Sequence, residues 1–263
     1  MRATHQSSHT QAVTRQICLL LFILFCAVPV LSQTVAVAAN ARYLIDDLAS
    51  AYRAASGNTI RTVVGSSGGL ASQIRNGAPF DVFLSADTAY PMGLWRDGWG
   101  LDTPRVYAYG TLILWTNARI DLKEGLRALL DPAVKKIALA NPQSAPYGSA
   151  AVGALKAAGL FDTLSSKIVY GESIAQVNQY VDSRAAEIGL TASSVVFAGS
   201  GRDVREWRRV DSTLYPPIPQ AALLVRRRGG AEAADAVRAL AFYRFLFRPE
   251  ARAIFRRFGY QVR

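Results

Sequence analysis

The sequence is poor in cysteine and histidine, two residue types on which much enzyme chemistry depends. The 263 residues include two cysteines and two histidines, which are Cys18, Cys26, His5 and His9. A zinc site needs histidine or cysteine ligands, and a nucleophilic serine normally needs a histidine base. No serine stands three residues before a lysine to form a Ser-x-x-Lys pair. The sequence after residue 26 therefore argues against zinc enzymes and serine hydrolases.

The beginning of the chain differs from the rest. Arg15 is followed by the apolar run ICLLLFILFCAVPVLS. This run is shorter than the roughly 18 to 20 apolar residues of a membrane-spanning helix, and it ends in small residues near Ser32. These features predict a secretory signal peptide over residues 1–32, cleaved before Gln33, with an uncleaved anchor as the alternative. The mature chain would then have no cysteine, and its stability would come from its core alone.

One stretch matches a hydrolase motif. In VVGSSGGL, Gly65, Ser67 and Gly69 fit Gly-x-Ser-x-Gly, the turn that holds the nucleophile of many hydrolases. The predicted mature chain has no histidine to take the serine proton. We therefore interpret the match as accidental and expect no catalytic residues and no enzyme activity.

Strand and helix patterns alternate along most of the chain. Apolar runs bounded by turn residues predict strands at residues 33–40, 59–64, 80–87, 135–142, 165–173 and 187–194. Residues 105–117 form a long apolar extended run that is too long for one simple strand. Helical spacing of apolar residues predicts helices at 41–57, 70–76, 88–98, 149–159 and 173–183. This alternation is typical of parallel sheets in an α/β fold.

Four of these predicted strands lead into small or polar residues that open a helix. The openings are at Asn40, at Ser67, at Tyr147 and Gly148, and at Ser173 and Ile174. The first turn of a helix leaves backbone N–H groups unpaired and carries the positive end of the helix dipole, so its natural ligand is an anion. Ligands of α/β proteins sit at the carboxyl ends of strands. Ordinary capped helices without a ligand are the alternative at this point.

Several segments resemble the periplasmic molybdate-binding proteins of bacterial ABC importers. They are VAVAAN, SSGGLASQIRNGAPFDVFLSAD, ALANPQSAPYGSAAVGAL, EIGLTASS and RPEARAIFRRFGY, in the same order over residues 35–263. The resemblance implies a two-lobed α/β periplasmic binding protein, each lobe a mostly parallel sheet flanked by helices, with the chain crossing twice between them. It places lobe 1 at residues 33–109 and 215–263, and lobe 2 at residues 110–214.

The resemblance also implies a binding site for a tetrahedral oxyanion. The matching positions are Asn40 at the end of the first strand, Ser67 as the helix-capping serine, and the backbone N–H groups of Tyr147 and Ile174. Ala192 departs from the pattern, because many family members have a tyrosine there. We expect molybdate, and tungstate with it, to bind through neutral donors, with no cofactor and no metal held directly by side chains.

The expected partner is the membrane permease of an ABC importer, and the expected form is a periplasmic monomer. One alternative is a protein of the same fold for sulfate, thiosulfate or phosphate. Another is a secreted basic protein that binds polyanions through arginines at residues 202–209, 226–228 and 248–257. The formal charge is +11, or +9 without Arg2 and Arg15 of the predicted signal peptide. No nucleic-acid motif accompanies this charge, so we expect no nucleic-acid partner.

Overall fold

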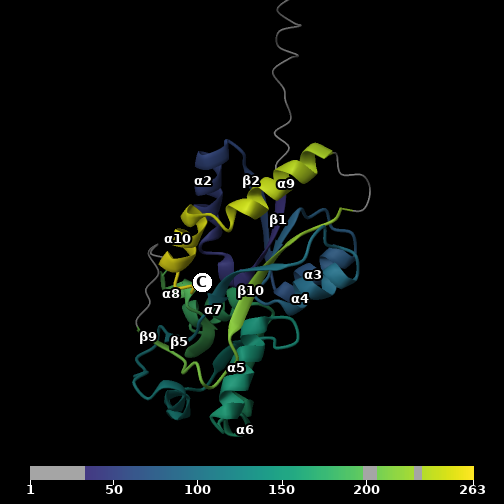
Figure 1. The fold of residues 1–263 in the computed structure, drawn as a ribbon. Coiled ribbons are helices and arrows are strands. Elements are labelled where there is room, and N and C mark those ends of the chain that lie inside the picture. Colours follow the sequence, from purple (N-terminus) through teal and green to yellow (C-terminus); the bar gives the residue numbers. More distant parts are fainter. Residues whose placement is uncertain (1–32, 198–205, 228–232) are drawn as a thin grey trace, which may run out of the picture. The chain divides into compact units, whose positions relative to one another are not determined.

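The fold is described here from a computed structural model that covers residues 33–197, 206–227 and 233–263 (Figure 1). The predicted signal peptide, residues 1–32, lies outside the described residues, and so do residues 202–205 and 228 of the arginine-rich segments. Residues 33–263 form one compact unit. Within the described ranges, no helix is both long enough and apolar enough to cross a membrane.

The described strands form two five-stranded sheets. The first sheet has the order β2-β1-β3-β10-β4. Its strands are β1 (Gln33–Ala38), β2 (Ile60–Gly65), β3 (Val82–Leu84), β4 (Arg105–Gly110) and β10 (Ile218–Leu224). The second sheet has the order β7-β6-β8-β5-β9. Its strands are β5 (Leu112–Thr116), β6 (Ile137–Ala140), β7 (Ile168–Gly171), β8 (Ile188–Ala192) and β9 (Glu206–Arg209).

Helices connect most of these strands. The α-helices are α2 (Ile45–Ser56), α3 (Ser67–Arg75), α4 (Ala89–Arg96), α5 (Pro146–Ala157), α6 (Phe161–Leu164), α7 (Ile174–Asp182), α8 (Ser194–Phe197), α9 (Ala233–Phe245) and α10 (Pro249–Arg257). The 3-10 helices are η1 (Ala39–Ala41), η2 (Gly125–Leu130) and η3 (Ser165–Lys167). Helices α3 and α5 each begin three residues before the predicted start, so Ser67 and Tyr147 both lie in a first helical turn.

The first sheet is covered by helices on both faces (Figure 1). Side chains alternate between the faces of a strand. Accordingly, Val35 and Val37 of β1 join the apolar cluster made with α2, α9 and α10, whereas Ala36 joins the cluster made with α3 and α4. In the first cluster, the rings of Tyr52 and Phe242 pack edge to face with centroids 5.1 Å apart. This packing fixes the end of β1, from which the chain enters η1.

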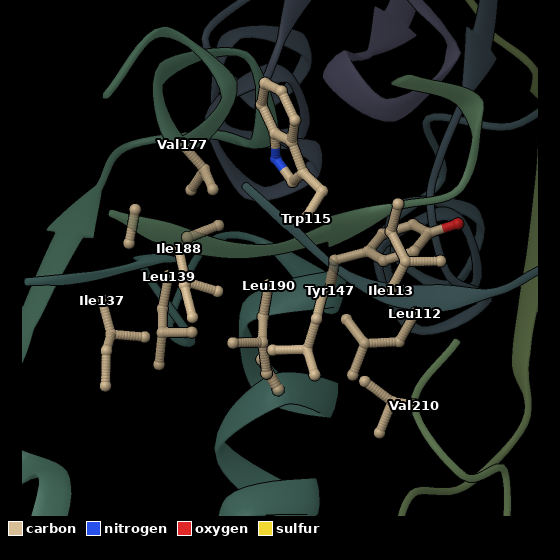
Figure 2. Close-up of a cluster of buried hydrophobic side chains, with 14 of the residues drawn as sticks. Leu112, Ile113, Trp115, Ile137, Leu139, Tyr147, Val177, Ile188, Leu190 and Val210 are labelled. Carbon is tan, nitrogen blue, oxygen red and sulfur yellow. The ribbon is translucent and has the colours of Figure 1, made fainter. Parts of the chain in front are cut away.

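The second sheet is also buried on both faces. Every residue of β5, β6 and β8 is buried. Figure 2 shows Trp115 and Val177 on one face of this sheet, and Ile137, Leu139 and Leu190 on the other. Near-continuous apolar strands are expected where helices cover both faces. The strand ends that lead into α5 and α7 are therefore held by a large core.

The chain passes between the two sheets twice. It leaves the first sheet at Gly110 and enters the second at Leu112, and it returns between Arg209 and Ile218. The run at 105–117, which is too long for one simple strand, therefore forms two strands in different sheets.

Each sheet contains two parallel and two antiparallel pairs. The α/β class is confirmed, but the sheets are mixed rather than mostly parallel. Strands β10 and β5 run antiparallel to their neighbours because each follows a crossing between the sheets instead of a helix packed on a sheet face.

Candidate functional site

A small cavity brings together all four residues that the sequence singled out. Its lining residues are Ala38, Ala39, Asn40, Ser66, Ser67, Ala86, Ala145, Pro146, Tyr147 and Ile174. They come from the end of β1, the loop after β3, and the starts of α3, α5 and α7. The volume open to the centre of a water molecule is about 10 Å³, enough for about one water. A four-oxygen anion would therefore require the walls to separate slightly.

The start of α3 contributes two serines with different roles. Ser66 is the N-cap, and its Oγ accepts a hydrogen bond from the Gly69 N–H at 3.2 Å. The capping serine is therefore Ser66, and the prediction that Ser67 caps this helix is wrong. Ser67 is the first helical residue, and its buried Oγ accepts from the Ala86 N–H at 3.0 Å. This bond leaves the proton of the Ser67 hydroxyl available to a ligand.

The start of α5 is held close to strand β6. Pro146 is the first residue of the helix and has no N–H, so the first backbone donor of this helix is Tyr147. A side chain at Gly148 would place its Cβ 2.1 Å from the carbonyl oxygen of Ala140, the last residue of β6. Glycine is therefore required for this close approach, which positions the Tyr147 N–H at the cavity.

The start of α7 presents its own unpaired N–H groups. Ser173 is the N-cap, with φ −148° and ψ 169°, and its side chain makes no capping bond. Ile174 follows as the first helical residue and is 4% exposed. Its N–H has no partner one turn earlier in the helix, as at every helix start. The Ile174 N–H belongs to α7, which follows strand β7 of the second sheet. Ser67 belongs to α3, which follows strand β2 of the first sheet.

Asn40 is engaged differently from the expectation. Its amide nitrogen, Nδ2, donates to Gln220 Oε1 at 2.8 Å and to Tyr260 Oη at 2.9 Å. Its backbone carbonyl accepts from Ser194 Oγ at 2.6 Å. Among the described residues, the buried Asn40 Oδ1 has no hydrogen-bond partner. The predicted amide donor is therefore used inside the protein in this arrangement.

Ala192 supplies no hydroxyl to the cavity, and the Tyr147 hydroxyl contacts Gln220. Ala192 is fully buried in β8, opposite Leu112, and is not among the described residues that line the cavity. The hydroxyl of Tyr147 accepts a hydrogen bond from Gln220 Nε2 at 3.0 Å. Burial raises the pKa of the Tyr147 phenol well above its usual value of 10.0, so this hydroxyl stays protonated at neutral pH.

The cavity is lined by neutral groups. None of the side chains that line it, within the part of the chain described, carries a formal charge. The same part holds no group of three or more histidine, cysteine, aspartate or glutamate side chains suited to a metal ion. Three helix starts with unpaired N–H groups surround the space, and helix N-termini favour negative charge. The arrangement can accept the oxygens of an anion by hydrogen bonding.

Hydrogen bonds join elements of the two sheets near this cavity. The Gly68 N–H donates to the Ser144 carbonyl at 2.9 Å, and the Tyr90 hydroxyl donates to the Gln143 carbonyl at 2.7 Å. The Ser194 bond to Asn40 is a third link. Elements of the first sheet and elements of the second sheet are therefore in contact around the site.

Sequence reasoning missed the supporting residues. Ser66 stands beside Ser67, and nothing in the sequence distinguishes the capping serine from its neighbour. Gln220 and Tyr260 lie 180 and 220 residues from Asn40 along the chain. No local pattern links them to it, so only the three-dimensional structure could identify them.

Comparison with known proteins finds relatives that match most of the chain. The chain is 36% identical over 239 residues to the molybdate-binding protein ModA of Azotobacter vinelandii, covering 90% of this chain and 93% of the relative. It is 37% identical over 228 residues to the ModA of Rhodobacter capsulatus, covering 86% of each. The solved structure of the A. vinelandii periplasmic molybdate-binding protein matches with a TM-score of 0.81 and 30% identity, covering 88% of this chain and all of that one.

The family comparison covers almost the whole described chain. The profile of the family described as bacterial extracellular solute-binding protein matches residues 33–261. The match includes both sheets and all four sequence-predicted site residues. The chain belongs to this family of bacterial extracellular solute-binding proteins.

Proposed function

We propose that this protein captures molybdate, and tungstate with it, in the cavity lined by Asn40, Ser67, Tyr147 and Ile174. The observation that supports this most directly is the convergence of three helix starts and a serine hydroxyl on one cavity without charged side chains. The relatives that match over most of the chain are named as molybdate-binding proteins. They are binding proteins, and the proposed function is transport rather than catalysis.

The mechanism follows from the charge and shape of the ion. Molybdate is a compact dianion with four oxygens that only accept hydrogen bonds. The Ser67 hydroxyl and the N–H groups of Tyr147 and Ile174 are donors, and they come from elements that follow both sheets. Each hydrogen bond to a charged group contributes roughly 1.5–3 kcal/mol. Several such bonds together replace the hydration of the ion and favour contact between the two parts of the molecule.

Cavity size and donor type select the ligand. Molybdate and tungstate have nearly the same size, so both should reach the same donors. Sulfate is smaller and would reach fewer of them well. Phosphate is partly protonated at pH 7 and brings a donor to a site that offers mostly donors. We therefore expect weak binding of sulfate and phosphate.

The two sheets correspond to two proposed lobes. Lobe 1 contains residues 33–109 and 215–263, and lobe 2 contains residues 110–214. Ligand contacts from both lobes would favour a hinge closure, and the closed form would deliver the ion to the membrane permease of an ABC importer. The proposed protein is a monomer exported to the periplasm by a signal peptide at residues 1–32. Amino-terminal sequencing of the exported protein tests the cleavage before Gln33, and sedimentation tests the monomer.

Calorimetric titration of the mature chain, residues 33–263, with molybdate, tungstate, sulfate and phosphate tests the ligand. The proposal expects molybdate and tungstate to bind with similar affinity, and sulfate and phosphate at least tenfold more weakly. Tighter binding of sulfate or phosphate would assign the protein to another oxyanion. Stabilisation by heparin alone would instead support the basic polyanion-binding alternative, which the relatives do not favour.

A pair of serine variants on one helix tests the site. Ser67→Ala removes a buried hydroxyl at the cavity, whereas Ser72→Ala removes an exposed hydroxyl of the same helix α3. We expect Ser67→Ala to weaken molybdate binding by about tenfold or more, and Ser72→Ala to bind like the parent. Equal affinities of the two variants would contradict the assigned site.

A further inference from the structure

A buried group of polar side chains lies next to the cavity, and we call it the amide–tyrosine cluster. Its members are Asn40, Tyr107, Tyr147, Gln220 and Tyr260, each at most 4% exposed. They come from η1, β4, α5, β10 and the segment after α10. The cluster therefore connects the cavity residues Asn40 and Tyr147 to β4 and β10, the two strands of the first sheet that lie next to the crossings between the sheets.

The hydrogen bonds of the cluster leave one atom without a partner. Asn40 Nδ2 donates to Gln220 Oε1 and to Tyr260 Oη, and Gln220 Nε2 donates to Tyr147 Oη. Within the described part of the chain, Asn40 Oδ1 has no donor near it. Asn40 Oδ1 is thus the side-chain atom that remains for a ligand in the cavity, and it is an acceptor. An oxyanion offers acceptors too, so this orientation disfavours it.

Turning both amides by 180° exchanges their nitrogen and oxygen atoms and keeps the other atoms in place. Gln220 Nε2 then donates to Asn40 Oδ1 at the 2.8 Å contact and to Tyr107 Oη at the 3.0 Å contact. The Tyr147 hydroxyl donates to Gln220 Oε1 across 3.0 Å. The Tyr260 hydroxyl, which donates to the Asn40 backbone carbonyl at 2.9 Å, then donates to Asn40 Oδ1 instead, and this carbonyl keeps its bond from Ser194. Asn40 Nδ2 becomes the free group, with two protons for an anion.

The tyrosines of the cluster can take part in both arrangements. Burial raises the pKa of Tyr107, Tyr147 and Tyr260 above the usual value of 10.0. Each hydroxyl therefore stays protonated at neutral pH and can either donate or accept. For Tyr107, the turned arrangement leaves its proton to the Ser85 carbonyl, 3.1 Å away.

Neither amide can turn alone without loss. If only Asn40 turned, its Oδ1 would face Gln220 Oε1 at 2.8 Å, two acceptors without a proton between them. Gln220 also has little freedom to move away. A Cβ on Gly110 would lie 2.6 Å from Gln220 Nε2 and 2.0 Å from Tyr147 Oη. The end of β4, where the chain leaves the first sheet, therefore packs directly against Gln220 and Tyr147.

We propose that Gln220 is a positioning residue that sets which atom Asn40 presents to the ligand, and that the two amides turn together when an oxyanion binds. Of the two orientations, only the donor orientation of Asn40 offers protons to an anion. This inference rests on the proposed function, because it assumes an anion in this cavity.

A double-mutant cycle on the mature chain tests the coupling, with molybdate affinity measured by calorimetry. Gln220→Met keeps the length of the side chain and removes its amide. We expect it to weaken molybdate binding about tenfold. In an Asn40→Ala background the same substitution should change affinity less than twofold, because Gln220 acts through Asn40. When Gln220→Met is combined with Ser67→Ala, the two fold losses of molybdate affinity should multiply, because Ser67 bonds to Ala86 and not to the amide–tyrosine cluster.

Side-chain amide NMR supplies a readout that a purely structural role would not change. The Asn40 NH₂ signals, assigned by their loss in Asn40→Ala, should shift on molybdate addition in the parent and in the control variant Ser72→Ala, and less in Gln220→Met. If Gln220→Met does not fold, Tyr147→Phe takes its place in the cycle, because it removes the hydroxyl that holds Gln220.

The outcomes separate the two proposals. A parent protein that binds no molybdate overturns the proposed function. If the parent binds molybdate, either of two results overturns the role of Gln220 alone. One is a Gln220→Met variant with unchanged affinity, and the other is that the losses of affinity caused by Gln220→Met and Asn40→Ala multiply in the double variant.

Discussion

A backbone donor can be removed from the proposed site by the substitution Ile174→Pro. Ile174 is the first residue of α7, the helix position that tolerates proline best because its N–H has no partner within the helix. The residue before a proline must be extended, and Ser173 already is, with φ −148° and ψ 169°. The substitution should therefore delete one N–H while α7 stays intact.

The expected loss of affinity follows from the bond that is removed. A hydrogen bond from this N–H to a dianion contributes roughly 1.5–3 kcal/mol, which corresponds to about 10- to 150-fold weaker binding of molybdate. The Ile174 side chain is 4% exposed and belongs to the core of the second sheet. Its loss should lower the free energy of unfolding by about 2–5 kcal/mol, whichever residue replaces it.

Ile174→Ala is the matched control, because it loses the apolar side chain and keeps the N–H. Calorimetry should find the alanine variant within a few-fold of the parent in molybdate affinity and the proline variant far weaker. Urea unfolding without ligand should show similar destabilisation for both. If the proline variant binds molybdate as tightly as the alanine variant, the N–H of Ile174 is not a ligand and the reasoning is refuted.

Four further substitutions test the supports of the site and the core. Gly148→Ala should weaken molybdate binding at least tenfold, because its Cβ would lie 2.1 Å from the Ala140 carbonyl oxygen. By contrast, a Cβ at Gly153 in the same helix meets open space, so Gly153→Ala should stabilise the protein by about 0.5–1 kcal/mol in urea unfolding. Burial raises the pKa of Asp87, so its charged form costs stability at pH values above its usual pKa of 3.8. Asp87→Asn should therefore unfold at higher urea than the parent at pH 7, and this gain should vanish below pH 3.8. Tyr52→Phe should stabilise the protein by about 1 kcal/mol in the same assay, since its buried hydroxyl has no partner among the described residues.

The sequence predicted well those features that depend on short stretches of chain. The predicted strands at 33–40 and 59–64 correspond to β1 and β2, because their apolar residues are contiguous and their ends are marked by turn residues. The four helix openings were also visible locally. That these openings meet in one cavity follows from the common direction of β1, β2 and β3, and of β6, β7 and β8.

What the sequence could not predict depends on contacts between distant residues. The sequence indicated that the run at 105–117 is too long for one simple strand, and the chain does change sheets after Gly110. What the run itself does not show is that the Tyr147 hydroxyl lies where a side chain of residue 110 would lie, so that only glycine fits there. The mixed direction of the sheets has a similar origin, since β10 enters the first sheet from the second crossing.

The amide of Asn40 shows why a list of site residues is not yet a binding site. Asn40 is placed at the cavity by β1, which the sequence predicted, and by the 3-10 helix η1, which it did not. Its amide nitrogen contacts Gln220 and Tyr260, 180 and 220 residues away, and in our proposal Gln220 sets the atom that Asn40 presents. A neutral site has no fixed charge to attract an anion, so its selectivity depends on the orientation of its dipoles. Residues that hold those dipoles therefore contribute to ligand choice, even though they never touch the ion.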